Sequence, residues 1–65
     1  MQVFINQQTR ELPEAATLAD AIQALQPQPP FAAAVNLQFV PRGAYGQQPL
    51  KEGDRIEIIT PVTGG

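Results

Sequence analysis

The alternation of apolar and polar residues predicts two short strands and a helix in the first half of the chain. Residues 1–6 (MQVFIN) hold a β-branched and aromatic cluster typical of a strand, and residues 9–12 (TREL) predict a second strand paired with it as a hairpin. Within residues 17–26, apolar side chains recur at positions i, i+3, i+4 and i+7, which predicts an amphipathic helix. Thr17 is its expected N-cap, with Asp20 completing a capping box, and the prolines of 27-PQPP-30 end it.

The second half of the chain predicts three strands separated by turns. Residues 31–36 (FAAAVN) and 39–40 form strands on either side of a tight reversal, and residues 42–49 predict a loop or a single 3₁₀ turn. After a turn at 50–54 (LKEGD), the last strand 55-RIEIIT-60 places Ile56 and Ile58 on one face. Because Ile59 falls on the other face, that second face is not entirely polar.

The order strand, strand, helix, strand, strand, strand predicts an α+β fold. The first and last strands are the most apolar, so we expect them to lie side by side and parallel in the centre of a mixed sheet of four to five strands. The helix would then cover one face of that sheet, which is a β-grasp, or ubiquitin-like, arrangement. We assign residues 1–60 to this domain and residues 61–65 to a flexible C-terminal tail.

The composition excludes several kinds of catalytic or binding site. The chain contains no cysteine and no histidine, which removes disulfides, thiol nucleophiles, imidazole bases and the commonest zinc ligands. The net charge is −2 and the cations are scattered, whereas nucleic-acid binders usually carry a basic stripe. No apolar run approaches the length of a membrane span, and no signal peptide is visible at the start. We therefore expect a cytoplasmic protein with no metal, no bound cofactor, and no nucleic-acid or membrane partner.

The chain ends in 60-TPVTGG-65, and its last two residues have no side chains. Such an end fits a channel too narrow for any other residue, and it presents the α-carboxylate of Gly65, which is ionised at neutral pH. A carboxylate is a poor acyl donor until it is coupled to ATP as an acyl-adenylate, and the chain has no Walker-type loop with which to do this itself. The sequence therefore favours a carrier that a partner enzyme activates, and not a chain that is itself an enzyme. A plain interaction module with an idle end is the alternative.

Over its whole length the chain resembles the ThiS family of ubiquitin-like sulfur carriers. The resemblance rests on MQVFIN, the helix near TLADAIQAL, 35-VNLQFVPR-42 with Tyr45 soon after, the segment LKEGDRIEII and the terminal Gly-Gly. It implies that Gly65 is adenylated by a ThiF-like adenylyltransferase, which uses ATP, and is converted to a thiocarboxylate with sulfur from a cysteine desulfurase. It also implies sulfur delivery to thiazole synthase in thiamine biosynthesis, with Gly64 and Thr63 threading the tail into the partner.

The sequence leaves open the sulfur acceptor and the surface that partners bind. The ending PVTGG is similar to that of MoaD, the sulfur carrier of molybdopterin synthesis. Molybdopterin and tRNA thiolation therefore remain alternative destinations, as does attachment to protein lysines as a ubiquitin-like modifier. For the partner surface we predict Ile59 and Val62, on and beyond the last strand, together with Phe39 and Tyr45. Core packing is the alternative role for Phe39.

Overall fold

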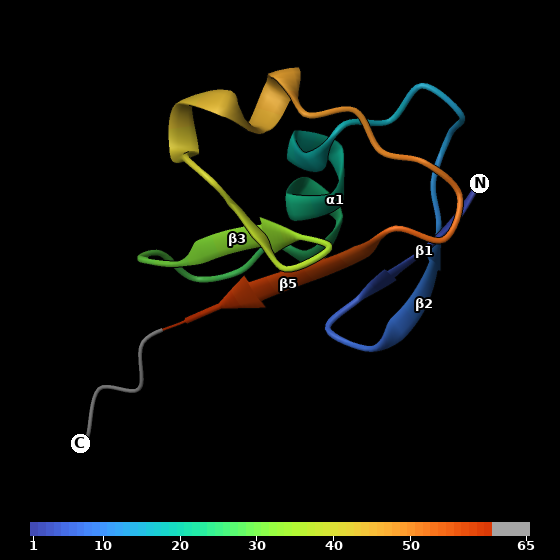
Figure 1. The fold of residues 1–65 in the computed structure, drawn as a ribbon. Coiled ribbons are helices and arrows are strands. Elements are labelled where there is room, and N and C mark those ends of the chain that lie inside the picture. Colours follow the sequence, from blue (N-terminus) through green and yellow to red (C-terminus); the bar gives the residue numbers. More distant parts are fainter. Residues whose placement is uncertain (61–65) are drawn as a thin grey trace.

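The computed structural model describes residues 1–60, which form one mixed sheet with a helix packed across it (Figure 1). The five strands lie in the order β2-β1-β5-β3-β4. This arrangement confirms the predicted β-grasp fold. In chain order the elements are β1 (Gln2–Ile5), β2 (Gln8–Glu11), α1 (Leu18–Leu25), β3 (Ala32–Val35), β4 (Gln38–Val40), the 3₁₀ helix η1 (Arg42–Gln47) and β5 (Arg55–Ile59).

The last strand, β5, lies at the centre of the sheet. It runs parallel to β1, where Phe4 pairs with Arg55 and Ile5 with Ile56, and antiparallel to β3 along its other side. The prediction that the two terminal strands are parallel neighbours is therefore correct. The parallel connection between them is made by the rest of the chain, with α1 crossing one face of the sheet (Figure 1).

The core lies between α1 and the sheet face that the helix covers. Buried residues alternate with exposed ones along β1 and β5, so each strand sends every second side chain toward the helix. Ile56 and Ile58 are buried, as their spacing predicted, and burying each side chain fully contributes roughly 1.5–3 kcal/mol. The core cluster consists of Val3, Ile5, Leu18, Ala21, Ala33, Val35, Val40, Leu50, Ile56 and Ile58.

The helix begins and ends close to the predicted residues. The Thr17 N–H donates to Asp20 Oδ2 at 2.8 Å, so Asp20 satisfies a backbone donor that the first helical turn leaves free. Gln26 adopts a left-handed backbone (φ 53°) and closes the last turn, ahead of the proline-rich segment. No helix within residues 1–60 is long and apolar enough to cross a membrane.

Both hairpins reverse through two residues with positive φ, and this moves the predicted strand boundaries. Asn6 and Gln7 (φ 50° and 70°) join β1 to β2, and Asn36 and Leu37 (φ 51° and 70°) join β3 to β4. Two-residue turns of this kind match the twist of the flanking strands. Because the first turn needs only two residues, Gln8 already pairs with Ile5, and β2 begins one residue earlier than the TREL segment indicated.

Candidate functional site: the C-terminal strand and its outer face

The strand that leads to the C-terminus is held on both sides by neighbouring strands. β3 pairs with β5 as far as Ile59, where Ala32 lies opposite, and β1 supports the first half of β5 from the other side. The predicted tail residues Val62, Thr63, Gly64 and Gly65 lie outside the described residues. The structure therefore describes the support from which the candidate reactive end continues.

Two asparagines at the hairpin turns fix the backbone of β5. Asn6 Oδ1 accepts a hydrogen bond from the Ile58 N–H at 2.9 Å, and Asn36 Oδ1 accepts one from the Arg55 N–H at 3.0 Å. The Asn36 N–H also donates to the Arg55 carbonyl at 2.7 Å. Each asparagine side chain therefore bonds to the β5 backbone beyond the point where its own strand ends. We call Asn6 and Asn36 the asparagine clamp.

The turn that begins β5 is organised by Asp54, which is only 7% exposed. Its Oδ1 accepts from Asn36 Nδ2 at 3.0 Å, and its Oδ2 accepts from the Lys51 N–H at 2.8 Å. Gly53 supplies the positive φ of 85° that the turn requires. Asp54 therefore serves the 50–54 turn and links that turn to the asparagine clamp.

The sheet face opposite α1 carries a small exposed apolar surface at the end of β5. Phe39 is 69% exposed and Ile59 56% exposed, and the register joins them through β3, because Ala34 pairs with Phe39 and Ala32 with Ile59. We call Ala32, Ala34, Phe39 and Ile59 the outer-face patch. Since Phe39 points away from the core, the alternative of core packing for this residue is wrong.

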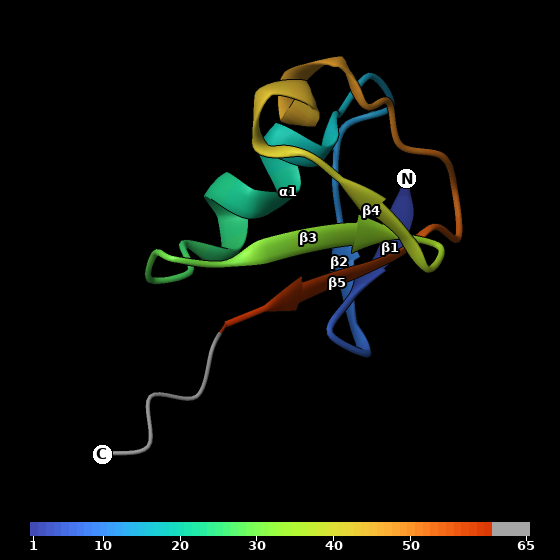
Figure 2. The same ribbon diagram turned by 60° about the vertical axis from the view of Figure 1, so that its left-hand side comes forward.

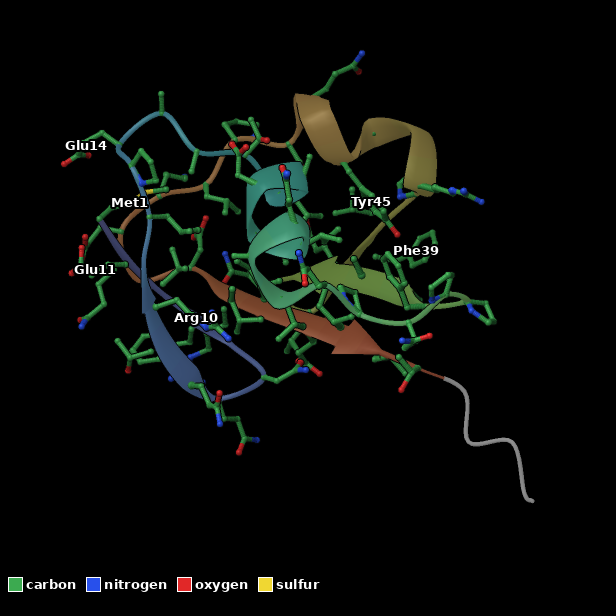
Figure 3. The ribbon with its side chains drawn as sticks, turned by 180° about the vertical axis from the view of Figure 1, so that it is seen from behind. Met1, Arg10, Glu11, Glu14, Phe39 and Tyr45 are labelled. Carbon is green, nitrogen blue, oxygen red and sulfur yellow. The ribbon has the colours of Figure 1, made fainter. Side chains whose placement is uncertain are left out.

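Tyr45 lies apart from the outer-face patch. It belongs to η1 and stacks on Phe31 with ring centroids 6.2 Å apart and planes 14° from parallel. Both rings are partly buried against the core, on the side of the sheet that α1 covers. The strand register therefore brings Phe39 and Ile59 together on the outer face, whereas Tyr45 belongs to η1, which packs beside α1. Figure 3 labels Phe39 on β4 and Tyr45 on η1.

Comparison with known proteins identifies the family. The ThiS family model matches residues 3–65, nearly the whole chain. The chain belongs to the ThiS family. The sulfur carrier protein ThiS of Escherichia coli (strain K12) is 32% identical over 66 residues, with both chains covered completely. The resemblance drawn from the sequence motifs is thereby confirmed.

Solved structures of ThiS proteins share the fold of this ThiS-family chain. The crystal structure of the thiamine biosynthesis protein ThiS from Geobacter metallireducens matches with a TM-score of 0.81 at 20% identity, covering both chains completely. The solution structure of a thiamine biosynthesis protein from the same organism gives 0.80 at 22% identity, covering this chain completely and 88% of that one.

Sequence reasoning missed three residues that shape the site of this ThiS-family chain. Asn6 and Asn36 each open a two-residue turn, and the Asn-x pairs between apolar segments were the available signal. The sequence places Leu37 in a reversal, and in the structure it is 86% exposed in the turn between β3 and β4. Its exposure depends on the turn geometry, which the apolar pattern alone does not give.

The described residues offer no metal-binding arrangement. Within residues 1–60, no group of three or more histidine, cysteine, aspartate or glutamate side chains is placed to hold a metal ion. Asp54 is the one buried charged side chain of this part of the chain, and its two carboxylate oxygens already accept hydrogen bonds from Asn36 and Lys51.

Proposed function

We propose that this chain is a sulfur carrier whose Gly65 is adenylated and then converted to a thiocarboxylate that donates sulfur for the thiazole of thiamine. The observation that carries the proposal is the ThiS-family match, which runs through the Gly-Gly pair to Gly65. The end-to-end similarity to the E. coli sulfur carrier supports it, and so does the absence of cysteine and histidine from the sequence. Without cysteine and histidine, the chain has no thiol nucleophile and no imidazole base of its own.

The proposed reaction needs only the terminal carboxylate of this chain. A carboxylate oxygen of Gly65 attacks the α-phosphorus of ATP, pyrophosphate leaves, and an acyl-adenylate forms. The persulfide of a cysteine desulfurase then displaces AMP to give an acyl disulfide, and a second thiol cleaves its S–S bond, which releases the thiocarboxylate and leaves a disulfide on the sulfur donor. The ThiF-like adenylyltransferase supplies the ATP site, so the carrier itself needs no bound cofactor. Gly64, which adds no side chain, keeps the threaded end slim, and Thr63 precedes it in the threaded segment.

The folded domain has the separate task of addressing the carrier to its partners. The outer-face patch is the candidate surface, because Phe39 and Ile59 expose apolar area beside the strand that leads to Gly65. Exposed aromatic side chains of this kind are enriched among residues that dominate protein interfaces. We propose that the adenylyltransferase and thiazole synthase both use this patch, with Val62 extending it along the chain, and that these encounters take place in the cytoplasm. For Tyr45 a partner contact remains a prediction.

The test is conversion of the purified carrier in a defined mixture. The chain is incubated with ATP, a ThiF-like adenylyltransferase, a cysteine desulfurase and cysteine, and its intact mass is measured. We expect the mass increase for exchange of one oxygen for sulfur. A variant that lacks Gly65 is the matched control, and it should unfold at the same temperature while accepting no AMP and no sulfur. An unchanged mass for the wild-type chain would refute the proposal.

The acceptor is tested in a second step. The thiocarboxylate form is offered separately to thiazole synthase, to molybdopterin synthase and to a tRNA-thiolating enzyme, and loss of sulfur from the carrier is followed by mass. We expect discharge with thiazole synthase. Discharge with one of the other two alone would keep the carrier chemistry and overturn the thiamine assignment. Lysine-linked adducts in cells would instead indicate a protein modifier.

A further inference from the structure

The two edges of β5 are paired to different lengths. On the β3 side, pairing continues to the last residue of the strand, Ile59. On the β1 side, it stops at Ile56, because the chain turns back at Asn6 and Gln7 to form β2. β5 therefore runs on past the β1–β2 turn, as both ribbon views show (Figures 1 and 2).

The backbone groups on this unpaired stretch follow from the hydrogen bonds before it. The Phe4 N–H donates to the Asp54 carbonyl and the Asn6 N–H to the Ile56 carbonyl, each at 2.9 Å, so even-numbered residues of β5 face the β1 side. Asn6 Oδ1 then accepts from the Ile58 N–H. The next groups in the row are the Ile58 carbonyl and the Thr60 N–H, and no strand of residues 1–60 lies beside them.

A surface hollow lies beside the first half of β5, next to the residues where β1 turns away. It has a volume of about 540 Å³ and lies between the β1–β2 turn and β5. The half-buried ring of Phe4 and the exposed side chains of Arg55 and Glu57 share its lining with Asn6, Gln7 and Ile56. Side chains of a strand alternate between faces, so a strand added at this edge would direct one side chain into the hollow.

The sequence leaves this edge unprotected. Exposed strand edges are usually blocked by lysine or proline, and neither occupies position 58 or 60. Gly65 follows Thr60 by only five residues, so a protein held at this edge is within about 17 Å of the proposed reactive carbonyl.

We propose that the open edge of β5, from Ile58 to Thr60, binds an extended segment of the adenylating enzyme as an added strand. The inference rests on the proposed function, since it takes as occupant the protein that acts on Gly65. Main-chain hydrogen bonds to the Ile58 carbonyl and the Thr60 N–H give the contact, and one side chain of the added strand enters the hollow, where it meets Phe4, Arg55 and Glu57.

A single substitution pair separates the backbone donor from the side chain. Thr60→Pro removes the N–H that faces the open edge, whereas Thr60→Ala removes the hydroxyl and keeps the N–H. In the adenylation assay we expect Thr60→Pro to raise the KM for the carrier about tenfold and Thr60→Ala to leave it within about twofold. Thermal unfolding of both variants should match the wild type, because this group has no partner in the described domain.

A second measurement tests the geometry directly. Amide hydrogen exchange of Thr60 in the wild-type chain should slow when the adenylating enzyme is added without ATP, while the Ile59 amide, which faces β3, should change little. Equal KM values for the two variants, or an unchanged Thr60 exchange rate, would overturn the edge proposal while leaving wild-type adenylation intact. If exchange of the Thr60 amide instead slows as the carrier concentration rises, with no enzyme present, a second copy of the chain occupies the edge and the proposed enzyme contact is wrong. If the wild-type chain is not adenylated at all, both this inference and the proposed function fail.

Discussion

Replacing Asn6 tests whether its side chain holds the last strand. The Asn6 side chain makes one hydrogen bond, to the Ile58 N–H at 2.9 Å, and its backbone has a positive φ of 50°. Asn6→Gly removes the hydrogen bond and tolerates this φ, Asn6→Ala removes the bond and strains the backbone, and Asn6→Asp keeps an acceptor oxygen in the same place. The three variants therefore separate the hydrogen bond from the backbone conformation.

The magnitudes follow from these two terms. Losing a hydrogen bond to a partly buried N–H costs about 1 kcal/mol, and holding alanine in the left-handed region costs about 1 kcal/mol more. We expect the free energy of unfolding to fall by about 1 kcal/mol in Asn6→Gly, by about 2 kcal/mol in Asn6→Ala, and by less than about 0.5 kcal/mol in Asn6→Asp. For a domain of this size, 1 kcal/mol corresponds to a shift of about 4–8 °C in Tm.

Two assays check this reasoning at different levels. Urea unfolding gives the free energies, and native-state amide exchange reports the bond itself: the Ile58 amide should exchange faster in Asn6→Gly, while the Glu57 amide, which faces β3, serves as an internal control. If the Ile58 amide exchanges at the wild-type rate in Asn6→Gly, the bond does not hold β5. If alanine and glycine are equally destabilising, the argument from positive φ is wrong.

Five further substitutions test the outer-face patch, the core and the turns. Phe39→Ser should change the free energy of unfolding by less than about 0.5 kcal/mol but raise the carrier's KM for adenylation at least about tenfold. The neighbouring core substitution Val40→Ala should instead lower the free energy of unfolding by about 2 kcal/mol in urea. An unchanged KM in Phe39→Ser would show that the adenylating enzyme does not use the outer-face patch. Leu37→Gly should raise Tm by about 4 °C, because Leu37 is exposed and its φ of 70° strains any residue with a Cβ atom. Leu37→Ala keeps a Cβ atom and should not raise Tm. Equal Tm values for the two variants would show that Leu37 is not strained. Asp54→Ala should lower the free energy of unfolding by about 2–4 kcal/mol, because it leaves two hydrogen-bond donors without their acceptor. A decrease of less than about 1 kcal/mol in urea unfolding would show that water replaces the carboxylate.

The parts of the fold that sequence reasoning predicted are those set by local pattern. The helix follows from its apolar stripe and from Asp20 placed three residues after Thr17, both of which act within one or two turns. The adjacency of β1 and β5 follows from their apolar content, because the most apolar strands are buried in the middle of a sheet. These signals need no knowledge of distant contacts.

The parts that were missed depend on contacts between distant residues or on exact turn geometry. Asn6 meets Ile58 across 52 positions in the chain, and only the parallel pairing of β1 with β5 brings them together. The outward direction of Phe39 depends on a two-residue turn, since one residue more or less would send it to the opposite face. In a strand as short as β4, the sequence holds too few alternations to decide this.

The buried core and the proposed partner contact lie on opposite faces of the same strand. Along β5, Ile56 and Ile58 are committed to the core, so their substitution changes folding before it changes any encounter with an enzyme. Ile59 on the other face adds little to the core, and the open edge beyond Asn6 adds no hydrogen bond within the described domain. A carrier whose reactive group is its own C-terminus needs this separation, because the surface beside that end must be free to meet more than one partner without unfolding the sheet that supports it. Substitutions at Ile58 and Ile59, adjacent in the chain, should therefore alter different quantities: the free energy of unfolding at Ile58 and the KM for the carrier at Ile59.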